Sequence, residues 1–332
     1  MIGHTWAETL LRKHIRAQQV RHAYLISGDD GIGKRTLAIQ FARALNCTNP
    51  GGTGEFCGDC RACSLILQGA HPDVYELIPE EGSATIKVDQ VRDLQHQLVL
   101  SPFEGRWRIG LIPDFERATE SAANALLKTL EEPGEHVVVL LTAIDSASLL
   151  PTIVSRCEIL PLRSVMSETI LEMVRARGFP LDQAQLITGI AQGRPGWALR
   201  LTEDPGILDM RVERLEQLSQ LLHSSRSERF DFVEGLLPRK DDLETQRRNV
   251  LEVLQTWMSI WRDAMRRSFN PTVSIINIDQ VELIEKINQV LNSDQVHECA
   301  NALQRTQKAI DHFANVRLAM EVLMLDLPFM GK

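Results

Sequence analysis

The sequence contains no long hydrophobic run, and this absence argues against a membrane-spanning helix. Its most apolar stretch, residues 137–141, is far shorter than the roughly 20 residues that such a helix needs. The N-terminal residues show no basic segment followed by an apolar core, so we expect no secretory signal. Internal repeats and low-complexity tracts are absent as well. A cytoplasmic protein without membrane contact is therefore expected.

An excess of basic residues is also lacking. The 332 residues include 36 basic and 44 acidic side chains, which gives a net charge of −8. No basic arm indicates a nucleic-acid partner, so any contact with DNA has to be local or made by other chains. A hydrophobic fraction of 44% and a charged fraction of 24% are ordinary for a folded protein. The length suggests two or three domains.

The pattern of apolar residues changes along the chain. Residues 1–165 alternate short apolar runs with helical patterns, which predicts an α/β domain with a mainly parallel sheet. Strands are predicted at residues 23–27, 107–112, 137–142 and 153–160, and helices at 35–45 and 121–131. Three short helices are predicted at residues 167–177, 181–192 and 197–201, which form a small helical module over 166–207. The pattern is then helical almost throughout, which predicts an all-α domain over 208–332.

A glycine-rich segment separates the first predicted strand from the first predicted helix. The candidate nucleotide-binding residues in and after it are Gly28, Gly31, Gly33, Lys34 and Thr36. Glycines let backbone N–H groups curl around phosphate oxygens, and the lysine can reach the β and γ phosphates. A Ser or Thr should follow the lysine to hold Mg²⁺, but Arg35 stands there, and Thr36 is rotated from that position by about 100°. The pattern predicts a phosphate-loop fold. It leaves two possibilities open: the loop binds ATP, or it is a glycine-rich turn without a ligand.

A phosphate-loop ATPase also needs acidic residues at the end of a neighbouring strand, one for Mg²⁺ and one to polarise water. The candidate strand is followed by Pro113, whose side chain cannot hold a metal, and only then by Asp114. Asp114 and Glu116 are interpreted as helix-capping or solvated carboxylates. Independent ATP hydrolysis is therefore not expected.

Four of the six cysteines lie close together: Cys47, Cys57, Cys60 and Cys63. Gaps of two residues let thiolates converge on a tetrahedral ion. In a cytosolic chain, clustered thiols bind metal more often than they form disulfides. Spacing and soft ligand type favour a structural zinc ion, held in an insert over about residues 47–63, over an iron–sulfur cluster or unligated thiols.

Arg156, between Ser155 and Cys157, follows an apolar run at the start of the fourth predicted strand. A lone arginine usually forms a surface ion pair. On the same domain as a phosphate loop, it could instead stabilise the charge of a transferring phosphoryl group that a neighbouring chain binds. Both readings stay open from spacing alone.

Together these motifs resemble those of bacterial clamp-loader subunits, the AAA+ proteins of the DNA polymerase III holoenzyme. The run from Asn124 to Pro133, the four-cysteine insert, residues 155–157 and the phosphate-loop remnant carry the resemblance. Residues 315–321 extend it to the last predicted helix, so it covers essentially the whole chain. It implies an AAA+ α/β phosphate-loop domain over 1–165, a small helical lid domain over 166–207 and a helical collar domain over 208–332.

Motor subunits of this family have three features that the chain lacks. Arg35 replaces the Mg²⁺-binding Ser or Thr, Pro113 interrupts the acidic pair, and Gly196 stands where a nucleotide-sensing arginine is expected. The resemblance therefore implies a subunit that offers Arg156 in trans to a neighbour's ATP and hydrolyses little itself. It implies gamma or tau and delta subunits as partners, with the sliding clamp and primer–template DNA met through the assembled hetero-oligomer. The alternative is an active ATPase motor subunit.

Overall fold

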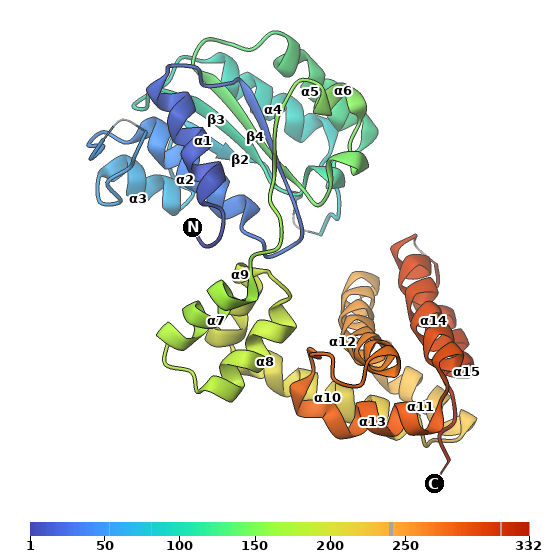
Figure 1. The fold of residues 1–332 in the computed structure, drawn as a ribbon. Coiled ribbons are helices and arrows are strands. Elements are labelled where there is room, and N and C mark those ends of the chain that lie inside the picture. Colours follow the sequence, from blue (N-terminus) through green and yellow to red (C-terminus); the bar gives the residue numbers. More distant parts are fainter. Residues whose placement is uncertain (53, 81, 239–241, 313, 332) are drawn as a thin grey trace. The chain divides into compact units, whose positions relative to one another are not determined.

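The computed structural model describes all residues except 53, 81, 239–241, 313 and 332 (Figure 1). Its internal contacts divide the chain into two compact units. The first comprises Met1–Met173 with Ala191–Ala198, and the second comprises Val174–Ile190 with Leu199–Lys332. Each unit is described by itself below.

The first unit alternates helices and strands. Its elements are α1 (Thr5–Arg16), β1 (Ala23–Ser27), α2 (Lys34–Asn46), α3 (Arg61–Leu67), β2 (Val74–Glu76), α4 (Val88–Val99), β3 (Arg108–Ile112), α5 (Glu120–Glu131), β4 (Val137–Ala143), α6 (Pro151–Val154) and β5 (Glu158–Pro161). The strands form one sheet in the order β2-β3-β4-β1-β5, and every neighbouring pair is parallel. In the register, Ala23 of β1 lies opposite Val139 of β4.

The sheet is covered by helices on both faces (Figure 1). Because successive side chains of a strand point to opposite faces, Leu25 packs with α4, α5 and α6, whereas Tyr24 packs with α1 and α2. All residues of β1, β3 and β4 are buried. Strands buried on both sides read as continuous apolar runs, which explains why the sequence predicts these three closely.

The fourth predicted strand, residues 153–160, is wrong in its first half. The helix α6 occupies that part, with Pro151 at its first turn, where a proline stabilises a helix start. The strand β5 begins only at Glu158. The sequence analysis also missed β2, whose three residues are half-buried and form no apolar run.

Helices α7 to α15 follow the sheet. They are α7 (Ser167–Ala176), α8 (Leu181–Ala191), α9 (Pro195–Glu203), α10 (Pro205–Leu221), α11 (Arg226–Leu236), α12 (Leu243–Phe269), α13 (Val281–Val290), α14 (Ser293–Asp311) and α15 (Val316–Asp326). Trp257 and Trp261 of α12 are fully buried at the centre of the second unit's core. The indole Nε1 of Trp257 donates to the carbonyl of Arg214 in α10 at 2.8 Å.

Arg229 of α11 is a buried cation that joins helix ends in the second unit. It is 4% exposed. Its guanidinium donates to the carbonyls of Leu221 (2.9 Å), Met324 (3.0 Å), Leu327 (2.6 Å) and Pro328 (2.8 Å). These carbonyls lie at the C-terminal ends of α10 and α15, where the last turns of a helix leave acceptors without intrahelical donors. Burial lowers the pKa of Arg229, and the carbonyl oxygens compensate its charge.

Within the part of the chain that the structure describes, none of the helices combines the length and the hydropathy that a membrane span requires. The parallel sheet, the glycine-rich loop between β1 and α2, and the helical C-terminal part agree with the expected AAA+ architecture. The predicted fold class is therefore confirmed.

Candidate functional site

The glycine-rich loop joins β1 to α2 and adopts backbone conformations that require glycine. Gly28, Gly31 and Gly33 have φ values of +145°, +76° and +108°, which other residues rarely adopt. A Cβ atom on Gly28 would lie 2.6 Å from the carbonyl oxygen of Leu162. The loop is therefore shaped by its glycines and packs closely against the residue that follows β5.

Lys34 is turned into this loop. Its side chain is buried, and its ammonium donates to the carbonyl oxygens of Gly28 (2.6 Å) and Asp29 (3.3 Å). The N–H of Gly196 donates to the carbonyl of Gly31 at 2.8 Å, so the first turn of α9 lies against the loop. A phosphate group bound here would have to compete with these contacts for Lys34.

Arg35 does not stand in for a magnesium ligand. Its Nε and Nη2 donate to the two carboxylate oxygens of Glu76, both at 2.6 Å, in a bidentate ion pair. This hydrogen-bonded pairing raises the pKa of Arg35. Thr36 is exposed. Because a guanidinium has only donors, Arg35 cannot coordinate a cation.

The acidic segment after β3 is also altered. Asp114 has a left-handed backbone (φ +48°), and its N–H donates to the hydroxyl oxygen of Thr142 at 3.0 Å. Glu116 accepts from the N–H of Ile144 at 3.3 Å through Oε1, while its buried Oε2 has no hydrogen-bond partner among the residues that the structure describes. Burial raises the pKa of Glu116, and the charge of Asp114 raises it further. The interpretation of Glu116 as a solvated carboxylate is therefore wrong.

Arg156 lies on the turn between α6 and β5, not at the start of a strand as predicted, because α6 occupies the residues before it. Its Nη1 donates to the carbonyl of Thr152 at 2.8 Å and contacts the hydroxyl of Ser155 at 3.4 Å. Its Nη2 donates to Oε1 of Glu131, the last residue of α5, at 2.7 Å. The side chain remains 35% exposed. The surface ion pair that the sequence left open is thus present in this chain.

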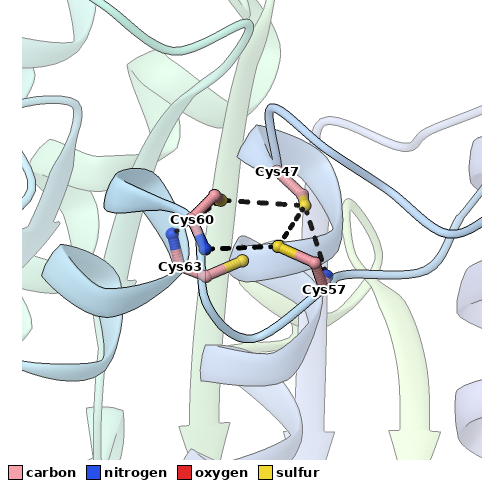
Figure 2. Close-up of side chains that lie close together, drawn as sticks. All are labelled: Cys47, Cys57, Cys60 and Cys63. Atoms are coloured by element: carbon pink, nitrogen blue, oxygen red, sulfur yellow. Dashed lines mark hydrogen bonds between the residues drawn. The ribbon is translucent and has the colours of Figure 1, made fainter.

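The four clustered cysteines point toward one another (Figure 2). Cys47 follows α2, Cys57 and Cys60 lie in the loop before α3, and Cys63 belongs to α3. The sulfur atoms all lie within 4.8 Å of one another. The Cys47 sulfur is 3.6 Å from that of Cys57 and 3.9 Å from that of Cys60. Tetrahedral zinc with Zn–S bonds of about 2.3 Å separates its sulfurs by about 3.8 Å, so the donor set fits this ion.

Backbone groups around the cysteines favour thiolates. The N–H groups of Cys57, Cys60 and Cys63 donate to the sulfurs of Cys47 (3.4 Å), Cys57 (3.3 Å) and Cys60 (3.4 Å). Burial opposes ionisation of Cys60, but hydrogen bonds from Thr48 and Cys63 outweigh it and lower the pKa to about 5. Burial raises the pKa of Cys63 to about 12. A bound cation would be needed to hold all four sulfurs as thiolates.

Two buried polar residues that anchor this region were missed by the sequence analysis. Asn46, the last residue of α2, accepts from the N–H groups of Arg106 (3.0 Å) and Trp107 (2.9 Å) and donates to the carbonyl of Trp107 (2.9 Å). Asp73, fully buried before β2, accepts from the N–H groups of residues 103, 104 and 105 at 2.6 to 2.9 Å. Neither has a local sequence signal, because their partners lie about 30 to 60 residues away.

Comparisons with known proteins match the chain to subunits of DNA polymerase III, among them delta', gamma and tau. The family model "DNA polymerase III, delta subunit" matches residues 3–166, and its C-terminal counterpart matches residues 211–328. A DNA polymerase III subunit delta' of Pseudomonas aeruginosa is 39% identical over 65% of this chain and 66% of its own length. The subunit delta' of Yersinia pestis is 33% identical over 65% of this chain and 68% of its own.

The matched region thus spans about two thirds of the length of these two relatives. The subunit delta' of Bacillus subtilis matches more extensively, at 26% identity over 96% of this chain and 94% of its own length. The chain therefore belongs to the delta' family of DNA polymerase III subunits.

Proposed function

We propose that the chain is the delta' subunit of a DNA polymerase III clamp loader in the cytoplasm. In this role it helps a ring of AAA+ subunits load the sliding clamp onto primer–template DNA, and it assists a neighbour's ATP hydrolysis while hydrolysing little ATP itself. The observation that carries the proposal is the pairing of Arg35 with Glu76 at the position of the magnesium ligand. A loop without that ligand lacks the usual means of holding Mg²⁺ beside a nucleotide.

Two further observations support a subunit that is not a motor. Pro113 follows β3 where a carboxylate is needed, and Glu116 is hydrogen-bonded to the backbone at the end of β4. Gly196 approaches the loop so closely that a Cβ on it would lie 2.8 Å from the carbonyl oxygen of Gly31. A side chain that senses nucleotide is therefore not available at this position.

Arg156 is proposed to act in trans on the ATP of an adjacent gamma or tau subunit. Head-to-tail contacts in a ring bring a surface of one subunit to a different surface of the next. A guanidinium that reaches the transferring phosphoryl group stabilises its developing charge. The partial exposure of Arg156 on a turn leaves it accessible to such a neighbour.

The C-terminal helices offer a surface for assembly, and we assign residues 208–332 to the collar and 166–207 to the lid. Leu318, Val322, Leu325 and Phe329 are 60%, 49%, 53% and 62% exposed. Their spacing of four, three and four residues places the first three on one face of α15. An exposed apolar stripe of this kind is typical of an interaction site, and partner subunits such as gamma, tau and delta are the proposed occupants.

The cysteine cluster is proposed to hold one structural zinc ion. Four sulfur ligands complete a tetrahedral shell and leave no position for a substrate or water. The ion would join the end of α2 to the start of α3, because Cys47 and Cys63 come from these two helices.

The decisive experiment measures DNA- and clamp-stimulated ATP hydrolysis by a reconstituted loader that carries either Arg156→Ala or Lys34→Ala in this chain. Each mutant complex is first shown by size-exclusion chromatography to assemble at the normal stoichiometry. We expect Arg156→Ala to depress turnover and Lys34→Ala to leave it unchanged.

The opposite pattern would identify an active motor subunit with an unusual magnesium site. In that case Lys34→Ala depresses turnover, Arg156→Ala is silent, and the isolated wild-type chain hydrolyses ATP. Either pattern decides between the two functions, because each variant removes the essential cation of only one of them.

A further inference from the structure

Two helix ends meet at Arg156. The carbonyl of Thr152 in α6 and the carboxylate of Glu131 at the end of α5 accept from different terminal nitrogens of the guanidinium, at 2.8 Å and 2.7 Å. Glu131 is the last residue of α5, where unpaired carbonyls create a negative potential. The guanidinium is therefore held from two sides by elements that are themselves packed together.

Glu131 stands in an unfavourable position unless it is paired. A carboxylate in the last turn of a helix is repelled by the negative end of the helix dipole. Arg156 offsets that repulsion through the 2.7 Å ion pair. Glu131 belongs to the run from Asn124 to Pro133 but contributes nothing to the buried core, because its side chain is 51% exposed.

The pairing does not exhaust the donors of Arg156. A guanidinium has five N–H groups, and within the described part of the chain the acceptors of this one are Thr152, Ser155 and Glu131. The Nε–H and one N–H of Nη2 remain for a further acceptor. The Nε–H is the type of donor that Arg35 uses toward a carboxylate oxygen of Glu76.

We propose that Glu131 is a positioning residue for Arg156: it fixes the guanidinium so that its remaining N–H donors, the Nε–H among them, can meet a phosphate group of a nucleotide held by the adjacent subunit. This inference rests on the proposed function of Arg156. An arginine that is already oriented loses less conformational freedom when it meets the phosphate. The gain appears in the transition state, where the charge on the phosphoryl group is largest.

The test uses the reconstituted loader and measures kcat and KM for ATP with DNA and clamp present. The variants in this chain are Glu131→Ala, Glu131→Gln, Arg156→Ala and the double variant Glu131→Ala/Arg156→Ala. The matched control is Glu132→Ala, which removes the neighbouring exposed carboxylate; in the described part of the chain it forms no ion pair. All complexes are compared at equal assembly.

We expect Glu131→Ala to lower kcat about two- to fivefold with KM unchanged. This range corresponds to the free energy that an exposed ion pair contributes. Glu131→Gln retains an acceptor oxygen and should recover part of this loss, and Glu132→Ala should match the wild type. In the Arg156→Ala background, Glu131→Ala should have no further effect, because residues that act as a unit are not additive.

Three outcomes would overturn the inference while leaving the proposed function intact, provided that Arg156→Ala itself lowers kcat. They are an unchanged kcat in Glu131→Ala, a raised kcat, and an additive loss in the double variant. A raised kcat would mean that Glu131 withholds Arg156 from the phosphate. A silent Arg156→Ala would instead remove the proposed function and the inference with it.

Discussion

Replacing Arg229 with methionine tests whether a buried cation holds the C-terminal helix in its unit. The substitution keeps the apolar stem and removes all four hydrogen bonds to the carbonyls at the ends of α10 and α15. Each bond contributes about 1 kcal/mol net, and an acceptor left unsatisfied in the interior costs about 1–3 kcal/mol. Methionine carries no charge, so the variant avoids the cost of desolvating the guanidinium, and this offsets part of the loss. We therefore expect a destabilisation of about 3 kcal/mol.

Hydrogen–deuterium exchange followed by mass spectrometry measures this loss of stability in α15 itself. Peptides covering α15 report the free energy with which that helix opens. A loss of about 3 kcal/mol should speed their exchange roughly 150-fold, since 1.4 kcal/mol is a factor of ten. Arg226→Met is the matched control, because Arg226 lies on the same helix but is exposed; it removes only a like charge that lowers the pKa of Arg229, so exchange of α15 should be no faster than in the wild type.

The reasoning about Arg229 is refuted if Arg229→Met accelerates the exchange of α15 less than fivefold in a chain whose sheet amides remain protected. Such a result would mean that water satisfies the carbonyls of Leu221, Met324, Leu327 and Pro328 as well as the guanidinium does. The compensation of a buried charge by carbonyl oxygens would then add nothing to stability.

Further predictions concern the first unit. Elemental analysis of the purified chain should find about one zinc ion. Cys63→Ser should lose the zinc, whereas the control Cys157→Ser should keep it. Zinc that survives Cys63→Ser would contradict the four-sulfur site. Burial alone would raise the pKa of Asp73, but three backbone N–H groups lower it. The ionised Asp73 therefore stabilises the fold at pH values above the ordinary Asp pKa, and this stabilisation disappears as pH falls through the lowered pKa. Asp73→Asn should thus cost about 2–3 kcal/mol at pH 7, and the difference in denaturant midpoint should shrink in acid; a difference that does not depend on pH would oppose this. Burial raises the pKa of Glu116, so its charge penalises folding as pH rises through that value. Glu116→Gln should raise the melting temperature at pH 7 but not in acid, and a lower melting temperature at pH 7 would count against it.

The sequence predicts most elements whose residues are buried on both sides. β1 is predicted to the residue, and β3, β4 and α5 to within one residue at each end. The short strand β2 escapes because Tyr75 and Glu76 interrupt any apolar run. The start of β5 is misplaced because Ile153 and Val154, typical strand residues, lie in a helical turn that Pro151 initiates.

In the candidate site, too, the sequence predicts the features that depend on residues close in sequence and misses the contacts between distant residues. The spacing of the cysteines anticipates their convergence, because Cys57, Cys60 and Cys63 are close in sequence. The glycines likewise predict the loop conformation. The partners of Arg35 and Arg156 are 41 and 25 residues away, so only the packing of the sheet and its helices brings them together.

The position of α2 links the metal site to the phosphate loop. The helix begins at Lys34 and ends at Asn46, next to Cys47, a length of about 20 Å. Asn46 ties that end to the residues before β3, and a metal would clamp Cys47 beside it. The face of α2 between these ends is buried against the sheet and α1, through Leu37, Phe41 and Leu45 among others. One packed helix therefore joins the cysteine cluster to the phosphate loop and keeps the two about 20 Å apart.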